Sequence, residues 1–454
     1  MKTRAAVLRL GVIAFLAGSP AAAAERLCDT SFEQCRTPLL SLIRAERMGI
    51  DVAFWFMEDD RYVTALIDRW RAGVPVRVVM DTEANVNYPL NAYALQRLRD
   101  AGIPMREKTA GGIVHWKTML FAGQNVVEFS GANFSPHAFV PVVPYEDYID
   151  EVIYFCDDPA VVNSFKTRYD DVWTMTSGYT NHANVTSLHR HYPTFPQDPE
   201  LNFPPSQNFA TRSVAAYTAE RVAIDSIIMR ITDRRHTDAL IAAKQRGVRV
   251  RLITEPSQYR DPVRLWHSWN VDRMYMAGIP IRVRKHLGHN HEKMTLLRGQ
   301  RMTVFGSSNW TSPSASSQLE HNYFTRKSWF FEWFTAQFER KWSNSTGHEE
   351  TQPFVPRPPT PPAYVAPAAG ATAVSLTGLR LRWNPGYWAH KADIYFGTSP
   401  SPPLYAANVT VTPAATASVA LPEVAPRTTY YWKVVSKTMA NLAASGAVRS
   451  FTTQ

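Results

Sequence analysis

The chain has 454 residues, of which 45% are hydrophobic and 19% charged, so it can bury sizeable cores and is not a disordered tail. Its formal net charge of +10 suits an anionic partner such as nucleic acid, an acidic lipid headgroup or a phosphate ester. Three cysteines are too few for a disulfide-scaffold miniprotein or a multi-cysteine zinc module, which excludes both classes.

The N-terminus, residues 1–24, has the order of a secretory signal peptide. Lys2 and Arg4 open it, an apolar run follows, and small residues close it. The run is shorter than the roughly 20 apolar residues that a membrane anchor needs. We therefore expect a secreted or periplasmic protein.

Such an oxidising compartment bears on the three cysteines. Cys28 and Cys35 lie seven residues apart and could close a small disulfide loop. Cys156 lies in an apolar run that starts at Val152, where a buried free thiol is the ordinary expectation.

The next feature along the chain is an internal repeat. The apolar run that starts at Ile50 recurs 174 residues later at Ile224. Further on, Gly102-Ile103-Pro104 recurs as Gly278-Ile279-Pro280 at an offset of 176. Chance does not keep such a register, so the sequence predicts two copies of one unit.

Each copy reads as an apolar strand, an amphipathic helix, a second strand, another helix and then shorter strands. Strands that alternate with helices indicate an α/β sheet covered on both faces. We expect one α/β/α repeat over residues 25–177 and another over residues 211–348. A stretch rich in Pro and Asn, residues 178–210, is predicted to join them as a loop or linker.

A second boundary is predicted at residues 349–367, where seven prolines stiffen the chain. Residues 368–454 then show short strand-like runs with turn residues between them, typical of an all-β sandwich. The run Pro426-Arg-Thr-Thr-Tyr-Tyr-Trp-Lys-Val, with Trp383 upstream, resembles fibronectin type III modules, and this resemblance implies a tyrosine at the corner before a core strand. We expect a non-catalytic adaptor, and a spacer or stability module is the alternative.

Each copy of the repeat carries the same set of polar residues. The set comprises a histidine, a lysine two positions on, an asparagine 18 positions after the histidine, and a later glutamate: His115, Lys117, Asn133 and Glu151 in the first copy, and His291, Lys293, Asn309 and Glu320 in the second. Residues i and i+2 of a strand share a face, so each histidine is expected beside its lysine. These eight residues are the predicted catalytic group.

If the copies pack about a pseudo-twofold axis, both sets converge on one cleft. Lysines and asparagine amides are donors suited to the non-bridging oxygens of a phosphoryl group. One imidazole can attack phosphorus while the other protonates the leaving oxygen, because histidine titrates near neutrality. A glutamate that accepts the second ring proton would set each tautomer. The lysines supply the positive charge, so no metal or other cofactor is expected.

These motifs resemble the phospholipase D superfamily, whose signature is His-x-Lys-x4-Asp followed by Gly-Ser-x-Asn. Both histidines, lysines and asparagines match over residues 40–345, and residues 306–309 read Gly-Ser-Ser-Asn in full. The resemblance implies two repeats packed as a pseudo-dimer. It also implies a phosphohistidine intermediate on His115, with His291 as the general acid, and the reversed roles remain open.

Two departures from the signature matter. Ala122 and Arg298 stand where the family has aspartate, and Gly131 stands where it has serine. The family aspartate is mainly structural, so we expect an active but divergent enzyme. The alternative is a relic that binds phosphate or lipid without turnover.

The substrate stays open among three reactions of a phosphodiester. Phospholipid headgroup hydrolysis is preferred, because the apolar loop Pro136–Tyr145 could touch a membrane surface transiently, although it could equally pack on the protein's own core. A nuclease is the second reading, with Trp116, Phe134 and Trp310 stacking bases or, alternatively, packing in the core. Transfer of the phosphatidyl group to an alcohol is the third.

Four residues beside the motifs are predicted to bind substrate: Ser307, Ser308, Trp116 and Trp310. His286, His289 and Asn290 crowd upstream of His291, but this run does not match zinc-ligand patterns, so no metal site is expected. No stable protein partner is predicted.

Overall fold

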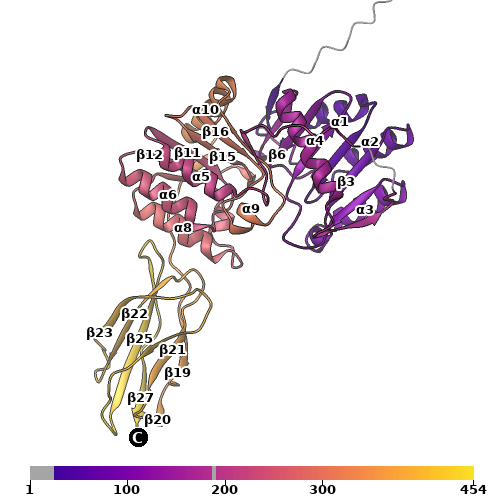
Figure 1. Cartoon of the computed structure of the whole chain (residues 1–454). Helices are drawn as coiled ribbons and strands as arrows, with labels where there is room; N and C mark the ends of the chain where they lie inside the picture. Colours follow the sequence, from indigo (N-terminus) through magenta and orange to yellow (C-terminus); the bar gives the residue numbers. More distant parts are fainter. Residues whose placement is uncertain (1–24, 187–190) are drawn as a thin grey trace, which may run out of the picture.

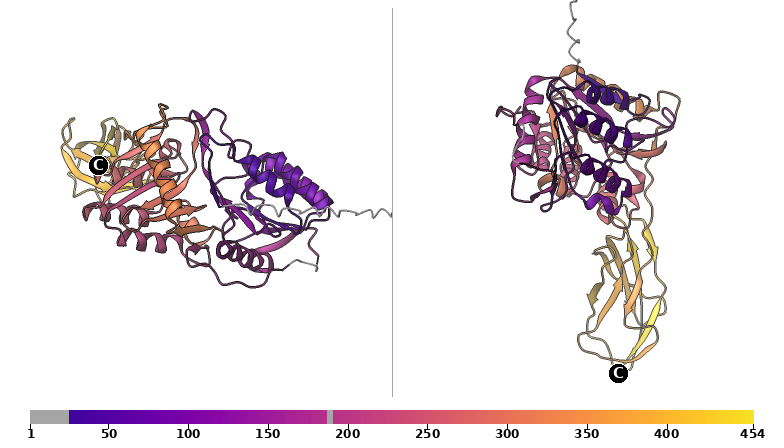
Figure 2. Two further views of the ribbon diagram at one scale, coloured as in Figure 1. Left: turned by 90° about the horizontal axis from the view of Figure 1, so that it is seen from above. Right: turned by 90° about the vertical axis from the view of Figure 1, so that its right-hand side faces the viewer.

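The computed structural model describes residues 25–186 and 191–454. The predicted signal peptide, residues 1–24, lies outside the described residues. Figure 1 shows two α/β units side by side and a body of β-strands that projects from the second unit. In the side view of Figure 2 these C-terminal strands extend away from both α/β units.

The first unit is built on an eight-stranded sheet in the order β1-β8-β6-β5-β2-β3-β4-β9. Its strands are β1 (Arg26–Asp29), β2 (Ile50–Phe54), β3 (Val76–Met80), β4 (Met105–Lys108), β5 (Lys117–Phe121), β6 (Val126–Ser130), β8 (Val152–Cys156) and β9 (Tyr179–Ala183). Its helices are α1 (Arg36–Ala45), α2 (Asp60–Arg71), the 3₁₀ helix η1 (Glu83–Val86), α3 (Pro89–Asp100) and α4 (Pro159–Thr174).

The second unit repeats this plan in the order β10-β17-β16-β15-β11-β12-β13-β18. Its strands are β10 (Leu201–Asn202), β11 (Ala223–Ile228), β12 (Arg249–Thr254), β13 (Ile281–Arg284), β15 (Lys293–Leu297), β16 (Met302–Gly306), β17 (Asn322–Thr325) and β18 (Thr351–Pro353). Its helices are α5 (Phe209–Ala219), α6 (Arg234–Gln245), α7 (Pro256–Tyr259), α8 (Leu265–Met276), α9 (Ser312–Ser316) and α10 (Ser328–Ser343). The prediction of a mixed α/β fold with two repeats is confirmed.

Equivalent residues start equivalent helices in the two units. The Asp59 side chain accepts a hydrogen bond from the Arg61 amide at the start of α2, and Asp233 does the same for Arg235 at the start of α6. A carboxylate at this position satisfies a backbone N–H that the helix leaves unpaired. The repeat in sequence is therefore a repeat in capping chemistry as well.

Side-chain alternation along the central strands divides the interior into layers. In β2, Val52 and Phe54 face the core that α1, α2 and α3 cover, whereas Ala53 faces the opposite side. That opposite side belongs to one apolar cluster that also contains Phe165 of α4 and Phe334 of α10. The two units share this central core, so they pack as a pseudo-dimer.

In each unit one buried glutamate ties the start of the central strand to a neighbouring hairpin. Oε1 of Glu46 accepts hydrogen bonds from the amides of residues 47, 48, 49 and 123. Oε1 of Glu220 does so for residues 221, 222, 223 and 299. The two glutamates are 174 positions apart, the same offset as the apolar runs, so the repeat in sequence carries a signal for them that was not part of the prediction.

The stretch at 178–210, predicted as a loop or linker, also contributes strands. Strand β9 pairs with β4 and forms one edge of the first sheet, and β10 pairs with β17 and forms one edge of the second. The Pro-rich stretch behaves similarly, because β18 pairs with β13 at the other edge of the second sheet. A proline at the end of an edge strand removes no hydrogen bond from the sheet interior, which makes Pro353 compatible with this place.

The cysteine predictions are confirmed. Cys28 and Cys35 form a disulfide, and Cys156 is a buried free thiol. Along the described residues, no helix combines the length and the apolar character that crossing a bilayer requires.

From residue 363 onward the chain forms strands alone among its regular elements, in a three-stranded and a six-stranded sheet. These strands are β19 (Ala363–Ala366), β20 (Ala371–Val374), β21 (Arg380–Asn384), β22 (Lys391–Gly397), β23 (Leu404–Thr410), β24 (Ala417–Ala420), β25 (Thr429–Lys437), β26 (Ala443–Ser445) and β27 (Arg449–Thr453). Both sheets contribute to one core that contains Trp383 and Trp432. The hydroxyl of Tyr430 accepts a hydrogen bond from the Ala425 amide at the start of β25. The likeness to fibronectin type III modules stays a prediction.

Candidate active site

Two short parallel pairings between the repeats bring the predicted residues together. Strand β7 (Asp147–Asp150) pairs with β14 (Leu287–Asn290), and the next residues are Glu151 and His291. Val114 bridges Leu319 in the same way, and the next residues are His115 and Glu320. Because the paired strands run parallel, the residues that follow them emerge side by side. Each histidine therefore meets the glutamate of the other repeat.

The glutamates bind the histidines through the same ring nitrogen. Nδ1 of His115 lies 2.8 Å from Oε2 of Glu320, and Nδ1 of His291 bonds to Oε1 of Glu151. Both glutamates are buried, which removes water as a competing partner. With Nδ1 occupied, Nε2 is the ring nitrogen left for a substrate.

Burial and nearby cations set the protonation of these pairs. Burial, followed by the charges of Lys117 and Lys293, lowers the pKa of both histidines well below the ordinary value. Burial raises the pKa of Glu320 to about 7 and that of Glu151 to about 8. Burial disfavours both the imidazolium form of each histidine and the carboxylate form of each glutamate. Each His–Glu pair can therefore share one proton between Nδ1 and the carboxyl oxygen near neutral pH.

The two His–Glu pairs differ in the residue that lies beside the glutamate. The Ser307 hydroxyl donates to Oε2 of Glu320 at 2.5 Å. The equivalent place beside Glu151 is Gly131, where a Cβ atom would lie 2.7 Å from Oε2 of that carboxylate. Gly131 therefore packs closely against Glu151, and no serine hydroxyl donates to this carboxylate from that position. The two His–Glu pairs consequently differ in their chemical surroundings.

The lysines lie beneath the histidines at the first positions of β5 and β15. Nζ of Lys117 donates to the His115 carbonyl at 2.8 Å, and Nζ of Lys293 donates to the His291 carbonyl. Burial lowers the pKa of Lys117 well below its usual range and that of Lys293 to about 8. Such desolvated ammonium groups interact strongly with a phosphoryl oxygen.

Both histidines and both predicted asparagines line one cleft of about 310 Å³. Oδ1 of Asn133 and Oδ1 of Asn309 are buried without a hydrogen-bond partner in the described part of the chain. An adjoining hollow of about 400 Å³ shares Asn133, Arg230 and His291 with this cleft. The cleft thus presents two imidazoles and two amides to one phosphate-sized group, whereas Lys117 and Lys293 are buried and line neither hollow.

The four predicted substrate-binding residues do not line this cleft. Trp116 is fully buried against Phe165, and Trp310 stacks on His236 with ring centroids 4.9 Å apart. Phe134 is likewise in the core, so the predicted base-stacking role is wrong for all three aromatic residues. Each follows directly on a polar motif residue, and alternation turns its ring into the core.

The serines are also buried, which corrects their predicted contact with substrate. Ser307 orients Glu320, and the Ser308 hydroxyl has no partner among the residues that the structure describes. Neither one is a lining residue of the cleft.

The two positions at which the family signature has aspartate lie far from the predicted catalytic histidines and lysines. Ala122 and Arg298 follow the last residues of β5 and β15, whereas the lysines begin these strands. Five residues of strand separate them from the lysines by roughly 16 Å. Arg298 instead binds Asp225 and Glu339. The departures therefore alter the supporting structure and leave the cleft intact.

The histidines upstream of His291 have other surroundings. His286 stacks on Tyr148 with ring centroids 3.7 Å apart, and His289 lines the adjoining hollow. Within the described residues no group of three His, Cys, Asp or Glu side chains has the spacing to hold a metal ion.

The loop Pro136–Tyr145 divides its residues between two environments. Ala138 and Phe139 are buried in the first unit's core, whereas Val142 and Val143 are exposed. Packing on the protein's own core is therefore observed for Ala138 and Phe139, and contact of the loop with a membrane surface stays a prediction.

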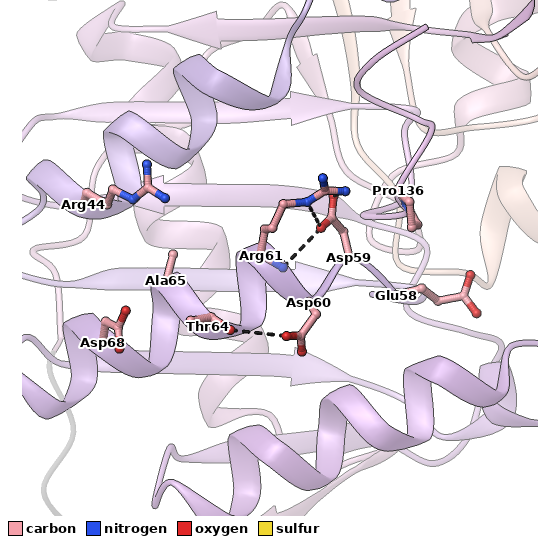
Figure 3. A pocket seen from close by; sticks show the side chains of 9 residues that line it. All are labelled: Arg44, Glu58, Asp59, Asp60, Arg61, Thr64, Ala65, Asp68 and Pro136. Carbon is pink, nitrogen blue, oxygen red and sulfur yellow. Dashed lines mark hydrogen bonds and ion pairs between the residues drawn. The ribbon is translucent and has the colours of Figure 1, made fainter. Parts of the chain in front are cut away.

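A larger hollow of about 530 Å³ at the start of α2 contains none of the predicted catalytic residues (Figure 3). Its Asp59 side chain is paired with Arg61, as Figure 3 shows, and also with Arg36. The hollow therefore offers no free nucleophile or acid–base pair at this carboxylate.

The cleft is also lined by residues that the motifs do not indicate, among them Tyr88, Arg230 and Arg264. None belongs to a motif. The signal that could have revealed them is a mismatch within the repeat, since each has a counterpart of different chemistry in the other copy.

Residues 39–173 and 216–342 match the family model described as "Cardiolipin synthase, PLD-like domain". Human mitochondrial cardiolipin hydrolase is 26% identical over 147 residues, which cover 32% of this chain and 56% of the relative. The mouse protein of that name is 27% identical over 150 residues, which cover 33% and 65%. The chain thus spans less than two thirds of these curated relatives.

Among solved structures, phosphatidylserine synthase from Haemophilus influenzae superposes with a TM-score of 0.53 at 13% identity. The superposition covers 73% of this chain and 87% of that protein, and it shows a shared fold.

Proposed function

The chain belongs to the PLD-like domain family, and on that premise we propose that it hydrolyses a headgroup ester of a phospholipid as a phospholipase D-type phosphodiesterase. One observation carries the proposal: two imidazoles, each bonded through Nδ1 to a buried glutamate, line a single cleft together with two asparagines. The names of the relatives, cardiolipin hydrolases, support a lipid substrate.

The proposed reaction has two steps. Nε2 of His115 attacks phosphorus, and the bond to the headgroup or alcohol oxygen breaks as His291 gives that oxygen a proton. His291 then takes a proton from water, whose oxygen displaces the phosphohistidine nitrogen and restores His115. Lys117 and Lys293 balance the charge on the non-bridging oxygens in both steps.

The asymmetry of the glutamates supports this division of roles. Glu320 accepts from Ser307 as well as from His115, which favours the carboxylate and keeps the Nε2 lone pair of His115 free. Glu151 lacks a serine donor, and its pKa near 8 favours a protonated carboxyl beside His291. Surroundings that shift the pKa values of two similar His–Glu pairs apart favour different roles for them, here His115 as the nucleophile and His291 as the acid.

We also propose export from the cytoplasm. Its support is the signal-like order of residues 1–24 together with the Cys28–Cys35 disulfide, a bond that persists in oxidising compartments.

The test is turnover of cardiolipin vesicles, single-stranded DNA and bis(p-nitrophenyl) phosphate by the mature chain. We expect hydrolysis of the lipid and of the generic diester, and loss of both in His115→Ala. Hydrolysis of DNA without hydrolysis of lipid would favour a nuclease. Binding without turnover of any of the three would indicate a relic.

A further inference from the structure

Two pairs of residues occupy symmetry-related positions on the walls of the cleft. Phe56 precedes Met57, which bridges Phe134, and Arg230 precedes Ile231, which bridges the equivalent Trp310. Likewise, residue 88 directly precedes α3, and residue 264 directly precedes the equivalent helix α8. The first copy thus places Phe56 and Tyr88 where the second copy places Arg230 and Arg264.

The two pairs have opposite chemistry. The rings of Phe56 and Tyr88 are stacked, with centroids 3.8 Å apart and planes inclined by 14°. Tyr88, Arg230 and Arg264 line the cleft that contains both histidines, and Phe56 lines the adjoining hollow. A cleft that is symmetric in its catalytic groups is therefore aromatic on one side and cationic on the other.

The arginine pair has no carboxylate partner. Nε of Arg230 donates to Oε1 of Gln258 at 2.8 Å. Arg264 donates through its terminal nitrogen to the Val263 carbonyl at 3.4 Å, and its Nε is buried without a partner among the described residues. Among the described residues neither arginine lies within ion-pair distance of a carboxylate, Glu83 of the same cleft included, although the charge of Asp261 acts to raise the pKa of Arg230. Arg284, in the same unit, is by contrast paired with Glu255.

Two neighbouring guanidinium groups without a carboxylate partner repel each other, which costs free energy in the folded protein. Burial, and next the charge of Arg264, lowers the pKa of Arg230 to about 10, so it stays protonated at neutral pH while the two cations repel each other. An anion between them would remove this cost. The scissile phosphate is not needed for that, because the proposed reaction already assigns Lys117 and Lys293 to its non-bridging oxygens.

We infer that Arg230 and Arg264 bind a second phosphate of the substrate, one short bridge away from the scissile phosphorus. The inference rests on the proposed function and names its substrate class: a lipid with two phosphates, of which cardiolipin is the probe. Arginine suits this task because its planar fork binds phosphate oxygens in pairs.

The one-sided charge favours such a lipid over nucleic acid. Within a polynucleotide, a scissile phosphate has further phosphates on both sides along the strand. The cleft offers arginines on one side only and the Phe56–Tyr88 stack on the other. A lipid with two phosphates matches this pattern, since its second anion lies on one side of the scissile bond.

The test replaces the arginines by their counterparts in the other copy, in the double variant Arg230→Phe with Arg264→Tyr. The substrates are cardiolipin and phosphatidylglycerol in vesicles of equal surface charge, because both lipids are anionic and only cardiolipin has a second phosphate. We expect the ratio of kcat/KM for cardiolipin to that for phosphatidylglycerol to fall by about 10- to 100-fold, the loss typical of charge-assisted hydrogen bonds.

Arg234→Gln is the matched control, because Arg234 is an exposed arginine of α6 that pairs with Asp238. It should leave the ratio unchanged. The variant Arg230→Gln with Arg264→Gln, which keeps polar side chains, should reproduce the fall if the aromatic variant does not fold.

An unchanged ratio in folded double variants, with the wild type active on both lipids, would overturn this inference and leave the proposed function standing. A wild type inactive on both lipids would overturn the proposed function, and the inference with it. A selective loss of single-stranded DNA cleavage, with the lipid ratio unchanged, would assign the arginines to a nucleic acid instead.

Discussion

Oε2 of Glu320 lies 2.8 Å from Nδ1 of His115, although the two residues belong to different repeats and are 205 positions apart in sequence. Glu151 and His291 form the reciprocal pair. Each imidazole is therefore oriented by the other half of the pseudo-dimer, and the active site exists only where the two repeats meet.

Replacement of Glu320 by glutamine should lower kcat for bis(p-nitrophenyl) phosphate by about 10²- to 10⁴-fold, the usual contribution of a positioned acid–base pair. The amide can present N–H to Nδ1 and cannot balance an imidazolium. The matched control is Glu332→Gln, an exposed carboxylate that pairs with Arg301. Equal kcat values for Glu320→Gln and the control would contradict the proposed role.

The variants His115→Asn and His291→Asn should differ in their first turnover of the same diester. p-Nitrophenol leaves without a general acid, so His291→Asn should release about one equivalent rapidly and then stall as a phosphohistidine. His115→Asn should give no burst. Stopped-flow absorbance measures this difference, and a burst in His115→Asn alone would reverse the two roles.

The rate should fall as the pH rises through about 8. Burial lowers the pKa of Lys293 to that value, so its ammonium charge is present below pH 8 and is lost above it. The lowered pKa of His115 keeps the nucleophile neutral well below pH 6.5. Profiles of kcat/KM against pH test this assignment.

In Lys293→Arg the alkaline limb should move to higher pH, because a guanidinium keeps its charge. Lys244→Arg, on α6, serves as the control and should leave the limb in place. An unmoved limb in Lys293→Arg would show that another group controls it.

Replacement of Glu220 by glutamine should lower the free energy of unfolding by about 1–3 kcal/mol, because four backbone amides lose a charged acceptor. Burial raises the pKa of Glu220, but the amides of Val222 and Gly299 outweigh it and hold the pKa below 4.5. The stabilisation is thus present above pH 4.5 and is lost as the pH falls through the folded-state pKa.

Thermal unfolding at several pH values measures this effect, with the exposed Glu349→Gln as the control. The gap in Tm between wild type and Glu220→Gln should narrow in acid. A constant gap would contradict the role of the carboxylate charge.

Several features could be predicted from the sequence because they are local or repeated. The register between the copies exposed His115 and His291 with their lysines and asparagines, and the strand–helix alternation indicated the α/β fold. The short spacing of Cys28 and Cys35 made their disulfide a reasonable expectation. In each case the relevant contacts lie within one segment or recur at a constant offset.

The remainder depended on how distant segments pack. Trp116 and Trp310 follow motif residues directly, but the shared core between the sheets, a property of the layers, draws their rings inward. Burial also took Ser307 and Ser308 out of reach of a substrate.

By itself, then, the sequence determined which chemical groups the protein has and that each occurs twice, because repetition is visible along a chain. Only the tertiary structure decided that the glutamates cross between repeats and that Arg230 and Arg264 stand opposite an aromatic pair. The physical reason is that these relations join residues of two separate units, and only packing about the pseudo-twofold axis brings such residues within reach of one another.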